Sequence, residues 1–82
     1  MELFYFTFSK GQVNVGHVQP IFAEDKETAT KIMDKKYNGH WCWQYTAEEW
    51  EDNKKELLEM NVPYETELRP IIQRGDSYYE MA

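Results

Sequence analysis

The sequence predicts an α+β fold, a small antiparallel sheet with two helices in the order β-β-α-β-α, followed by a C-terminal β-hairpin. Three observations indicate this class. An aromatic run alternates at residues 3–8, two later stretches carry apolar residues at helical spacing behind capping residues, and turn residues separate all of them. At 82 residues the chain is expected to form a single domain, 1–82.

The first two strands differ in character. Residues 3–8 place three phenylalanines on one face and Leu3, Tyr5 and Thr7 on the other, so we expect a central strand. Residues 13–22 predict a second strand, in which alternating valines are interrupted by a glycine and by Pro20. Because proline cannot donate to a sheet ladder, we expect this strand to lie at an edge, with a bulge near the glycine.

A first helix is predicted over about residues 26–38. Asp25 is a suitable N-cap, and Glu27 suits the positive end of the helix dipole. Alanine, isoleucine, methionine and tyrosine follow at helical spacing and form one apolar stripe. Asn38 and Gly39 are strong signals for the helix end.

The third strand is predicted at residues 40–45, with Trp41, Trp43 and Tyr45 on one face. A second helix is predicted from Ala47 to about Met60. Its start is a capping box, and its thin apolar stripe is made by the residues Ala47, Trp50, Leu57 and Leu58 with Lys54 interrupting it.

We expect Trp50 to pack inward against the third strand, although an exposed interface anchor is the alternative. The tail carries two prolines, and a turn at residues 73–76 predicts the hairpin. Its apolar residues need a surface to cover, either on this domain or on a partner.

The formal net charge of −6 lies entirely in the second half of the chain. Residues 1–45 hold five acids and five bases, whereas residues 46–82 hold ten acids and four bases. This field disfavours direct nucleic-acid binding and favours a basic protein partner. The candidate partner-binding residues are Glu48, Glu49, Glu51, Asp52, Glu56, Glu59 and Trp50. An acidic helix face that only keeps the protein in solution is the alternative.

Catalytic, metal and cofactor sites are not indicated. Cys42 is the only cysteine, which excludes an internal disulfide, and a zinc site has too few ligands. Cys42 and His40 lie about 7 Å apart along a strand with no third group to orient them, so we expect the cysteine to be packed in the sheet. The Arg74-Gly75-Asp76 tripeptide predicts a tight turn. A base-stacking role for the aromatic strand is disfavoured by its acidic surroundings.

The chain shows neither a secretion signal nor a membrane-spanning run, and we expect it to act in the cytoplasm of a bacterial host. The lone cysteine also fits a reducing compartment.

Three sequence blocks carry a family resemblance: Phe-Thr-Phe at 6–8, Tyr-Asn-Gly-His-Trp at 37–41, and Trp-Gln-Tyr-Thr-Ala-Glu-Glu-Trp at 43–50. The chain resembles short proteins of phages and prophages of Gram-positive bacteria over about residues 3–60, with residues 61–82 as an extension. It departs from their pattern at Trp43, where phenylalanine is frequent, and at Cys42, where a small apolar residue is frequent.

The resemblance implies a mobile-element context. Small acidic phage proteins often inhibit host defence nucleases, and some are anti-CRISPR proteins. The leading hypothesis is therefore a non-enzymatic protein that inhibits a host protein, such as a nuclease effector, at a basic nucleic-acid-binding surface. A homo-oligomeric structural or regulatory protein, such as a homodimer, is the alternative. An enzyme would require a site between subunits or an unseen cofactor.

Overall fold

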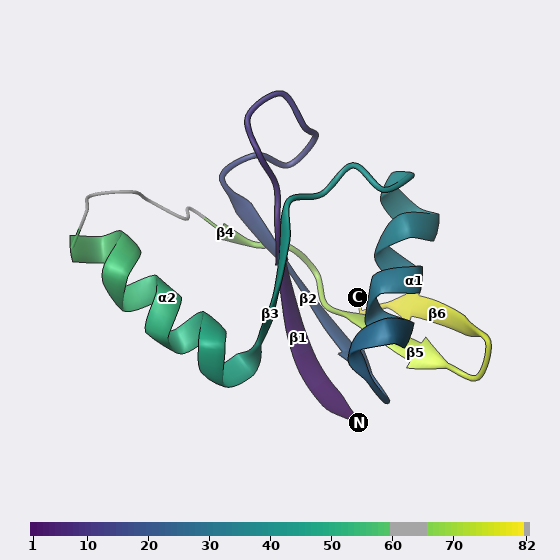
Figure 1. Ribbon diagram of the computed structural model, residues 1–82. Helices are drawn as coiled ribbons and strands as arrows, with labels where there is room; N and C mark the ends of the chain where they lie inside the picture. Colours follow the sequence, from purple (N-terminus) through teal and green to yellow (C-terminus); the bar gives the residue numbers. More distant parts are fainter. Residues whose placement is uncertain (60–65, 82) are drawn as a thin grey trace.

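The computed structural model describes residues 1–59 and 66–81, apart from the side chains of residues 57, 58 and 66. The elements follow the order β1 (Glu2–Thr7), β2 (His17–Ala23), α1 (Lys26–Tyr37), β3 (Trp43–Thr46), α2 (Ala47–Glu59), β4 (Thr66–Glu67), β5 (Ile71–Arg74) and β6 (Ser77–Glu80). The predicted α+β class and its element order are confirmed. Figure 1 shows the two helices on opposite sides of one sheet.

The sheet is mixed rather than wholly antiparallel. Its described strands run in the order β3-β1-β2-β5-β6, with β4 pairing the start of β2. Strands β3, β1 and β2 are antiparallel, and so are β5 and β6, but β4 and β5 run parallel to β2. The prediction that the first strand is central is confirmed, because β1 lies between β2 and β3.

The prediction that the second strand is an edge strand is wrong. Strand β2 pairs with β1 on one side and with β4 and β5 on the other. The Leu68 amide donates to the Val18 carbonyl at 2.8 Å, so the backbone of Val18 faces the side of β2 on which β4 and β5 lie. The backbone nitrogen of Pro20, two residues later in the strand, faces the same side. There β4 pairs residues 17 and 18 and β5 pairs residues 21 and 22, so Pro20 lies in the gap where no amide is needed. Its carbonyl accepts from the Gln19 side chain at 3.0 Å.

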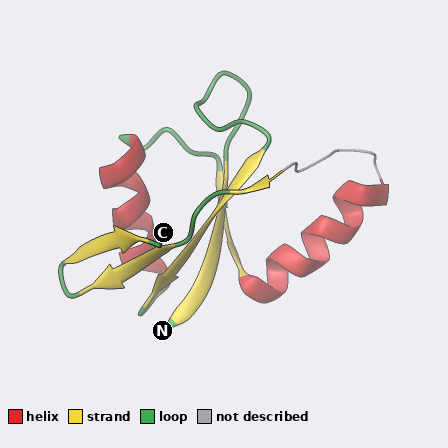
Figure 2. Cartoon of the chain, turned by 180° about the vertical axis from the view of Figure 1, so that it is seen from behind, coloured by secondary structure: helices red, strands yellow, loops and turns green. Residues whose placement is uncertain are grey.

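The second strand is also shorter than predicted. Residues 8–16 form loops and turns, and the two valines of the predicted alternation, Val13 and Val15, are exposed. Asn14 and Gly16 have φ angles of 62° and 84°, which no regular strand allows. Figure 2 shows this loop rising above the sheet.

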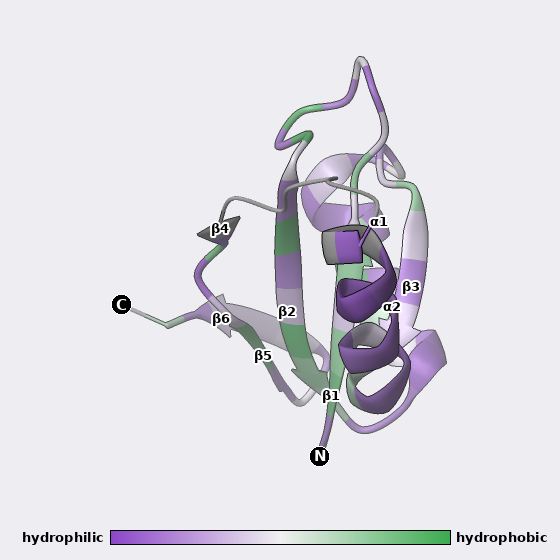
Figure 3. Ribbon diagram, turned by 90° about the vertical axis from the view of Figure 1, so that its left-hand side faces the viewer, coloured by the Kyte–Doolittle hydropathy of each residue, from purple (hydrophilic) through white to green (hydrophobic). Residues whose placement is uncertain are grey.

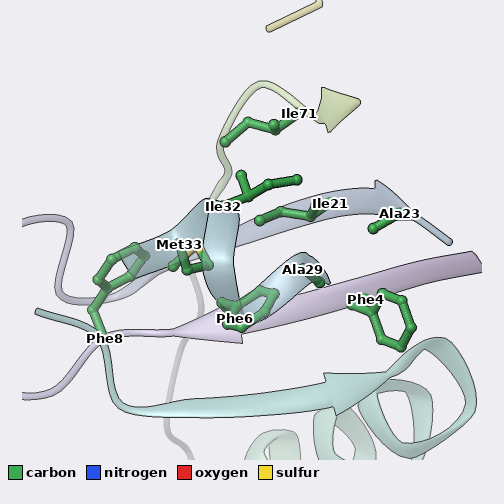
Figure 4. Packing of buried hydrophobic residues seen from close by; sticks show 9 residues of the cluster. All are labelled: Phe4, Phe6, Phe8, Ile21, Ala23, Ala29, Ile32, Met33 and Ile71. Atoms are coloured by element: carbon green, nitrogen blue, oxygen red, sulfur yellow. The ribbon is translucent and has the colours of Figure 1, made fainter. Parts of the chain in front are cut away.

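The main core lies between α1 and one face of the sheet (Figure 4). Alternation along β1 turns Phe4 and Phe6 toward α1, whose Ala29, Ile32 and Met33 are buried against them. The remaining core members are Phe8, Ile21, Ala23 and Ile71. The core therefore draws on the hairpin as well as on the residues before 60.

The first helix has the predicted caps. The Asp25 carboxylate accepts from the Thr28 amide at 2.7 Å, and Asn38 closes the helix in the left-handed conformation. The C-terminal hairpin is also confirmed, with Arg74 opposite Ser77 and Gly75 at φ 60° in the two-residue turn. Parallel pairing of β5 with β2 joins this hairpin to the domain.

Candidate partner-binding site

The second helix is held on the sheet by Trp50. Its indole is 1% exposed and stacks on Tyr5 of β1, with ring centroids 5.6 Å apart, and lies against Tyr45 of β3 at 5.5 Å. Tyr5 and Tyr45 are themselves paired across β1 and β3. The prediction that Trp50 packs inward on the third strand is confirmed. Because its side chain is buried, Trp50 positions α2 on the sheet and is not itself an exposed contact residue.

The capping box fixes where α2 begins. The Glu49 carboxylate accepts from the Thr46 amide at 2.8 Å, and the Glu49 amide donates to the Thr46 hydroxyl at 3.1 Å. These hydrogen bonds lower the pKa of Glu49 below its ordinary value. Of the predicted acids, Glu49 therefore has a structural role of its own.

The other predicted acids lie on the surface of α2. Four of them are spaced so that they share the side of the helix opposite Trp50, and we call them the outer stripe: Glu48, Asp52, Glu56 and Glu59. All four are exposed. The only base at this side of α2 in the described range is Lys55, so the stripe presents a negative surface.

Glu51 lies on the flank of α2 and forms an ion pair with Lys54 at 3.2 Å. The Lys54 side chain is 40% exposed, as expected for an ammonium at the edge of a packed helix. Burial raises the pKa of Tyr5 above its ordinary value, and the carboxylates of Glu67 and Glu51 raise it further.

The predicted stripe of α2 is only partly described. Ala47, Trp50 and Lys54 are placed, whereas the side chains of Leu57 and Leu58, together with Met60, lie outside the described residues. Glu65 and Pro63, a proline of the tail that is expected to interrupt regular secondary structure, lie outside the described residues as well.

Three expectations for residues 40–45 are wrong. The strand begins at Trp43, and Cys42 is exposed rather than packed in the sheet. Trp41 does not share a face with Trp43 and Tyr45. It packs edge-on against Phe6 in the main core, and its indole N–H donates to Asp34 of α1 at 2.8 Å. Strand β3 begins two residues after Trp41, and the side chain of Trp43 is 61% exposed.

A polar cluster that the sequence did not indicate lies beneath the end of α1. Gln19 is 2% exposed, and its side-chain amide donates to the carbonyls of Pro20 and Arg69 at 3.0 and 2.8 Å. The hydroxyl of Tyr37 donates to the Gln19 carbonyl oxygen at 2.7 Å. Burial raises the pKa of Tyr37 to about 12, so this proton is held. Gln19 thus connects β2, α1 and the segment before β5 and is satisfied within the domain.

Other chemical sites are limited. Within residues 1–59 and 66–81, no group of three or more histidine, cysteine, aspartate or glutamate side chains is placed to hold a metal ion. Neither helix in that part of the chain is both long and apolar enough to cross a membrane. The exposed Cys42 lies in an open hollow with Lys26, Trp43 and Glu49.

In the comparisons with known proteins, no protein-family model, curated protein or solved structure matches this chain. The geometry of the described residues supports one candidate site, a negatively charged helix surface that a buried tryptophan fixes to an α+β domain.

Proposed function

We propose that this chain is a non-enzymatic binding protein that attaches to a basic surface of a protein partner through the outer stripe of α2. The observation that carries the proposal is the four exposed carboxylates of that stripe, on a helix whose orientation is fixed by Trp50. Such a field speeds encounter with a basic partner and makes binding sensitive to salt.

The finer proposal concerns the kind of partner. A row of carboxylates resembles a phosphate backbone in charge, so a basic nucleic-acid-binding surface of a host protein is a suitable target. The resemblance to phage and prophage proteins supports a host defence protein, such as a nuclease effector, and an anti-CRISPR type of inhibition. Occupying that surface would block its nucleic-acid substrate without any chemical step.

The test uses two variants of equal net charge. In the first, Glu48, Asp52, Glu56 and Glu59 are each changed to Lys, which leaves the capping box and the Glu51–Lys54 pair in place. In the matched control, four exposed acids elsewhere, Glu2, Glu24, Glu27 and Asp76, are changed to Lys. Both carry the same charge change, so only its location differs.

We expect the tagged parent chain and the control variant to capture a basic protein from bacterial lysate at low salt and to release it at high salt. The outer-stripe variant should capture none of it while keeping the circular dichroism spectrum of the parent. Equal capture by the outer-stripe variant and the parent would refute the proposal.

A second candidate is a homodimer with a structural or regulatory role. The observation that favours it is apolar exposure near the sheet edge at β6, where Tyr79 and Met81 are 46% and 44% exposed. Light scattering at micromolar concentration separates the candidates, because an apolar dimer persists at high salt whereas attachment through the outer stripe does not.

A further inference from the structure

The outer edge of β6 has no strand beside it in the part of the chain that the structure describes. β6 is the last strand in the order β3-β1-β2-β5-β6. The Met81 amide donates to the Pro70 carbonyl at 2.9 Å, so this pair is hydrogen-bonded on the side of β5. Because hydrogen-bonded pairs alternate along an antiparallel ladder, the backbone groups of Tyr79 also face β5. The N–H and C=O groups of Tyr78 and Glu80 therefore point away from the sheet.

This edge lacks the features that usually keep an edge strand from pairing. Such features are prolines, bulges and charged side chains on the pairing side. The strand consists of Ser77, Tyr78, Tyr79 and Glu80, and its register with β5 continues without a bulge. Its one charge, on Glu80, is ion-paired with Lys36 of α1. β6 can therefore accept a further strand, because an extended segment supplies the hydrogen bonds that its edge offers.

The charges at this edge are compatible with a second copy of the chain. The Nζ atom of Lys35 lies 6.0 Å from the centroid of the Tyr78 ring, and Lys35 forms no ion pair with the described residues. Lys36 pairs with Glu80, so two bases and one acid meet on the α1 side of β6. The outer stripe lies elsewhere, and Figure 3 shows α2 on the other side of β2 from β5 and β6. The net charge of −6 is therefore not concentrated where two copies would meet at β6.

Charge also selects the register of such a pairing. Hydrogen bonds across the junction need outward-facing residues opposite each other, which in a twofold dimer centres the pairing on residue 78, 79 or 80. Tyr78 opposite Tyr78 would place Glu80 against Asp76 of the second copy, and Glu80 opposite Glu80 would place two carboxylates together. Like charges directly opposite are destabilising. Only Tyr78 opposite Glu80 avoids both contacts, and it sets Tyr79 opposite its own counterpart.

We infer that two copies of this chain join antiparallel along their β6 edges, with Tyr79 of one copy opposite Tyr79 of the other. Tyr78 and Glu80 of each copy then exchange backbone hydrogen bonds with Glu80 and Tyr78 of the second. The two Tyr79 side chains, each 46% exposed in the single chain, cover one another. On the α1 side, Glu80 of the second copy lies beside Tyr78 and so comes within reach of Lys35. Backbone, aromatic and ionic contacts thus fit one register.

This inference develops the homodimer candidate and does not depend on the outer stripe. Trp50 holds α2 over β1 and β3, so α2 stays outside the junction in both copies. A dimer therefore presents two outer stripes, and a partner with two basic sites would be held by both at once. The capture experiment above tests the outer stripe and the experiments below test the junction, so either can fail alone.

The first test is disulfide cross-linking of the full chain with Cys42→Ser, so that one introduced cysteine gives the signal. With Tyr79→Cys, the two sulfurs meet at a non-hydrogen-bonded pair, where the Cα atoms lie about 4.5 Å apart, within the range of a disulfide. The matched control is Ser77→Cys, on the same side of the same strand. Its two copies are offset by about 13 Å along the strand. On mild oxidation at micromolar concentration we expect about tenfold more linked dimer from Tyr79→Cys.

A second test exchanges the charges. Lys35→Glu sets acids together across the junction and Glu80→Lys sets bases together, so each variant alone should raise the Kd of the dimer about tenfold. In an equal mixture each introduced charge meets its opposite on the other variant, and we expect the two variants to associate with nearly the Kd of the parent. Lys10→Glu changes an exposed base in the loop before β2 and is the control, which should leave the Kd unchanged. Sedimentation velocity measures these constants.

Three results would overturn the inference. The first is linked dimer in equal amounts from Tyr79→Cys and Ser77→Cys, or from neither. The second is a mixture of the charge variants that associates no better than either variant alone. The third is a parent chain that sediments as a monomer at the concentrations used for cross-linking, in which case the outer stripe remains the candidate for partner binding. Capture of the partner by the outer-stripe variant would refute the proposed function instead and would leave the junction in place.

Discussion

The indole of Trp50 stacks on the ring of Tyr5, with ring planes 23° apart, and this contact joins α2 to the central strand of the sheet. The stack lies on the face opposite the main core, so the domain buries aromatic surface on both sides of β1. Because Trp50 is the largest of the fully buried side chains, the second layer of the fold depends on it more than on any other residue of α2 in the described range.

Trp50→Ala is expected to lower the free energy of unfolding by about 3–5 kcal/mol, as for other buried large aromatics. That is a large part of the stability available to a domain of this size, so the variant should be largely unfolded when purified. Urea denaturation followed by circular dichroism measures the change.

The control for this prediction is Trp43→Ala, which removes an indole that is 61% exposed and should change stability by no more than about 0.5 kcal/mol. A folded Trp50→Ala protein with an unchanged melting midpoint would contradict the packing of α2 described above.

The elements that were predicted correctly have local causes. Both helix starts are fixed by hydrogen bonds within four residues, from Asp25 and between Thr46 and Glu49, so the sequence pattern alone predicts them. The two-residue turn after Arg74 is likewise local. The inward direction of Trp50 follows from the helix start, because a helix of known beginning fixes which side each residue faces.

The failures involve long-range pairing. A proline in a strand predicts an edge strand, because its nitrogen cannot donate to a neighbour. Pro20 is an exception, since β4 and β5 leave a gap opposite it, and that gap depends on residues about 50 positions later in the chain. Trp41 leaves the strand alternation because its ring packs against Phe6 and its indole N–H donates to Asp34, and both contacts hold it on the side of the main core. The Gln19 cluster was missed because a lone glutamine carries no periodic signal. For the candidate site, the acids of the outer stripe were predicted because they lie on one helix, whose start fixes the side that each of them faces.

The C-terminal hairpin is expected to unfold together with the rest of the domain. Ile71 is fully buried in the main core, and β5 adjoins β2. Ile71→Ala should therefore cost about 2–5 kcal/mol of global stability. Met81→Ala, in the same segment but 44% exposed, is the control and should have little effect.

Hydrogen exchange adds a second measurement for the hairpin. The amides of β5 should exchange with the same opening free energy as those of β1. Much faster exchange in β5 would show instead that the hairpin opens independently, as an extension of a domain that ends before it.

Acid should weaken the fold through two capping carboxylates. Hydrogen bonds from the Thr28 and Thr46 amides lower the pKa values of Asp25 and Glu49 below their ordinary values of 3.8 and 4.5. Because both values are lower in the folded chain, these carboxylates stabilise it above their unfolded pKa values. The stabilisation is lost as the pH falls from about 5 through the folded values.

The double variant Asp25→Asn with Glu49→Gln keeps both capping groups while removing their titration. Its free energy of unfolding, measured in urea at intervals between pH 6 and pH 3, should fall less steeply than that of the parent. A slope equal to the parent's would show that other groups control the acid sensitivity.

The last prediction concerns the bond between Gln19 and Tyr37. Gln19→Leu leaves the Tyr37 hydroxyl and the carbonyls of Pro20 and Arg69 without the partner they have in the parent chain. Each buried group that loses its partner costs about 1–3 kcal/mol, so Gln19→Leu should be more harmful than its gain in apolar volume suggests. Tyr37→Phe alone removes one hydroxyl and should cost less.

A double-mutant cycle isolates this bond. Once Tyr37→Phe has removed the hydroxyl, Gln19→Leu leaves one group fewer unsatisfied, so the two costs should sum to more than the cost of the double variant. We expect a coupling of about 0.5–3 kcal/mol, measured by urea denaturation at pH 7. Thr30→Val with Gln19→Leu is the control cycle. The Thr30 hydroxyl bonds Lys26 and Gln44 instead, so additive costs are expected there. Additivity in the Tyr37 cycle as well would mean that the Gln19–Tyr37 hydrogen bond contributes nothing to holding α1 on β2.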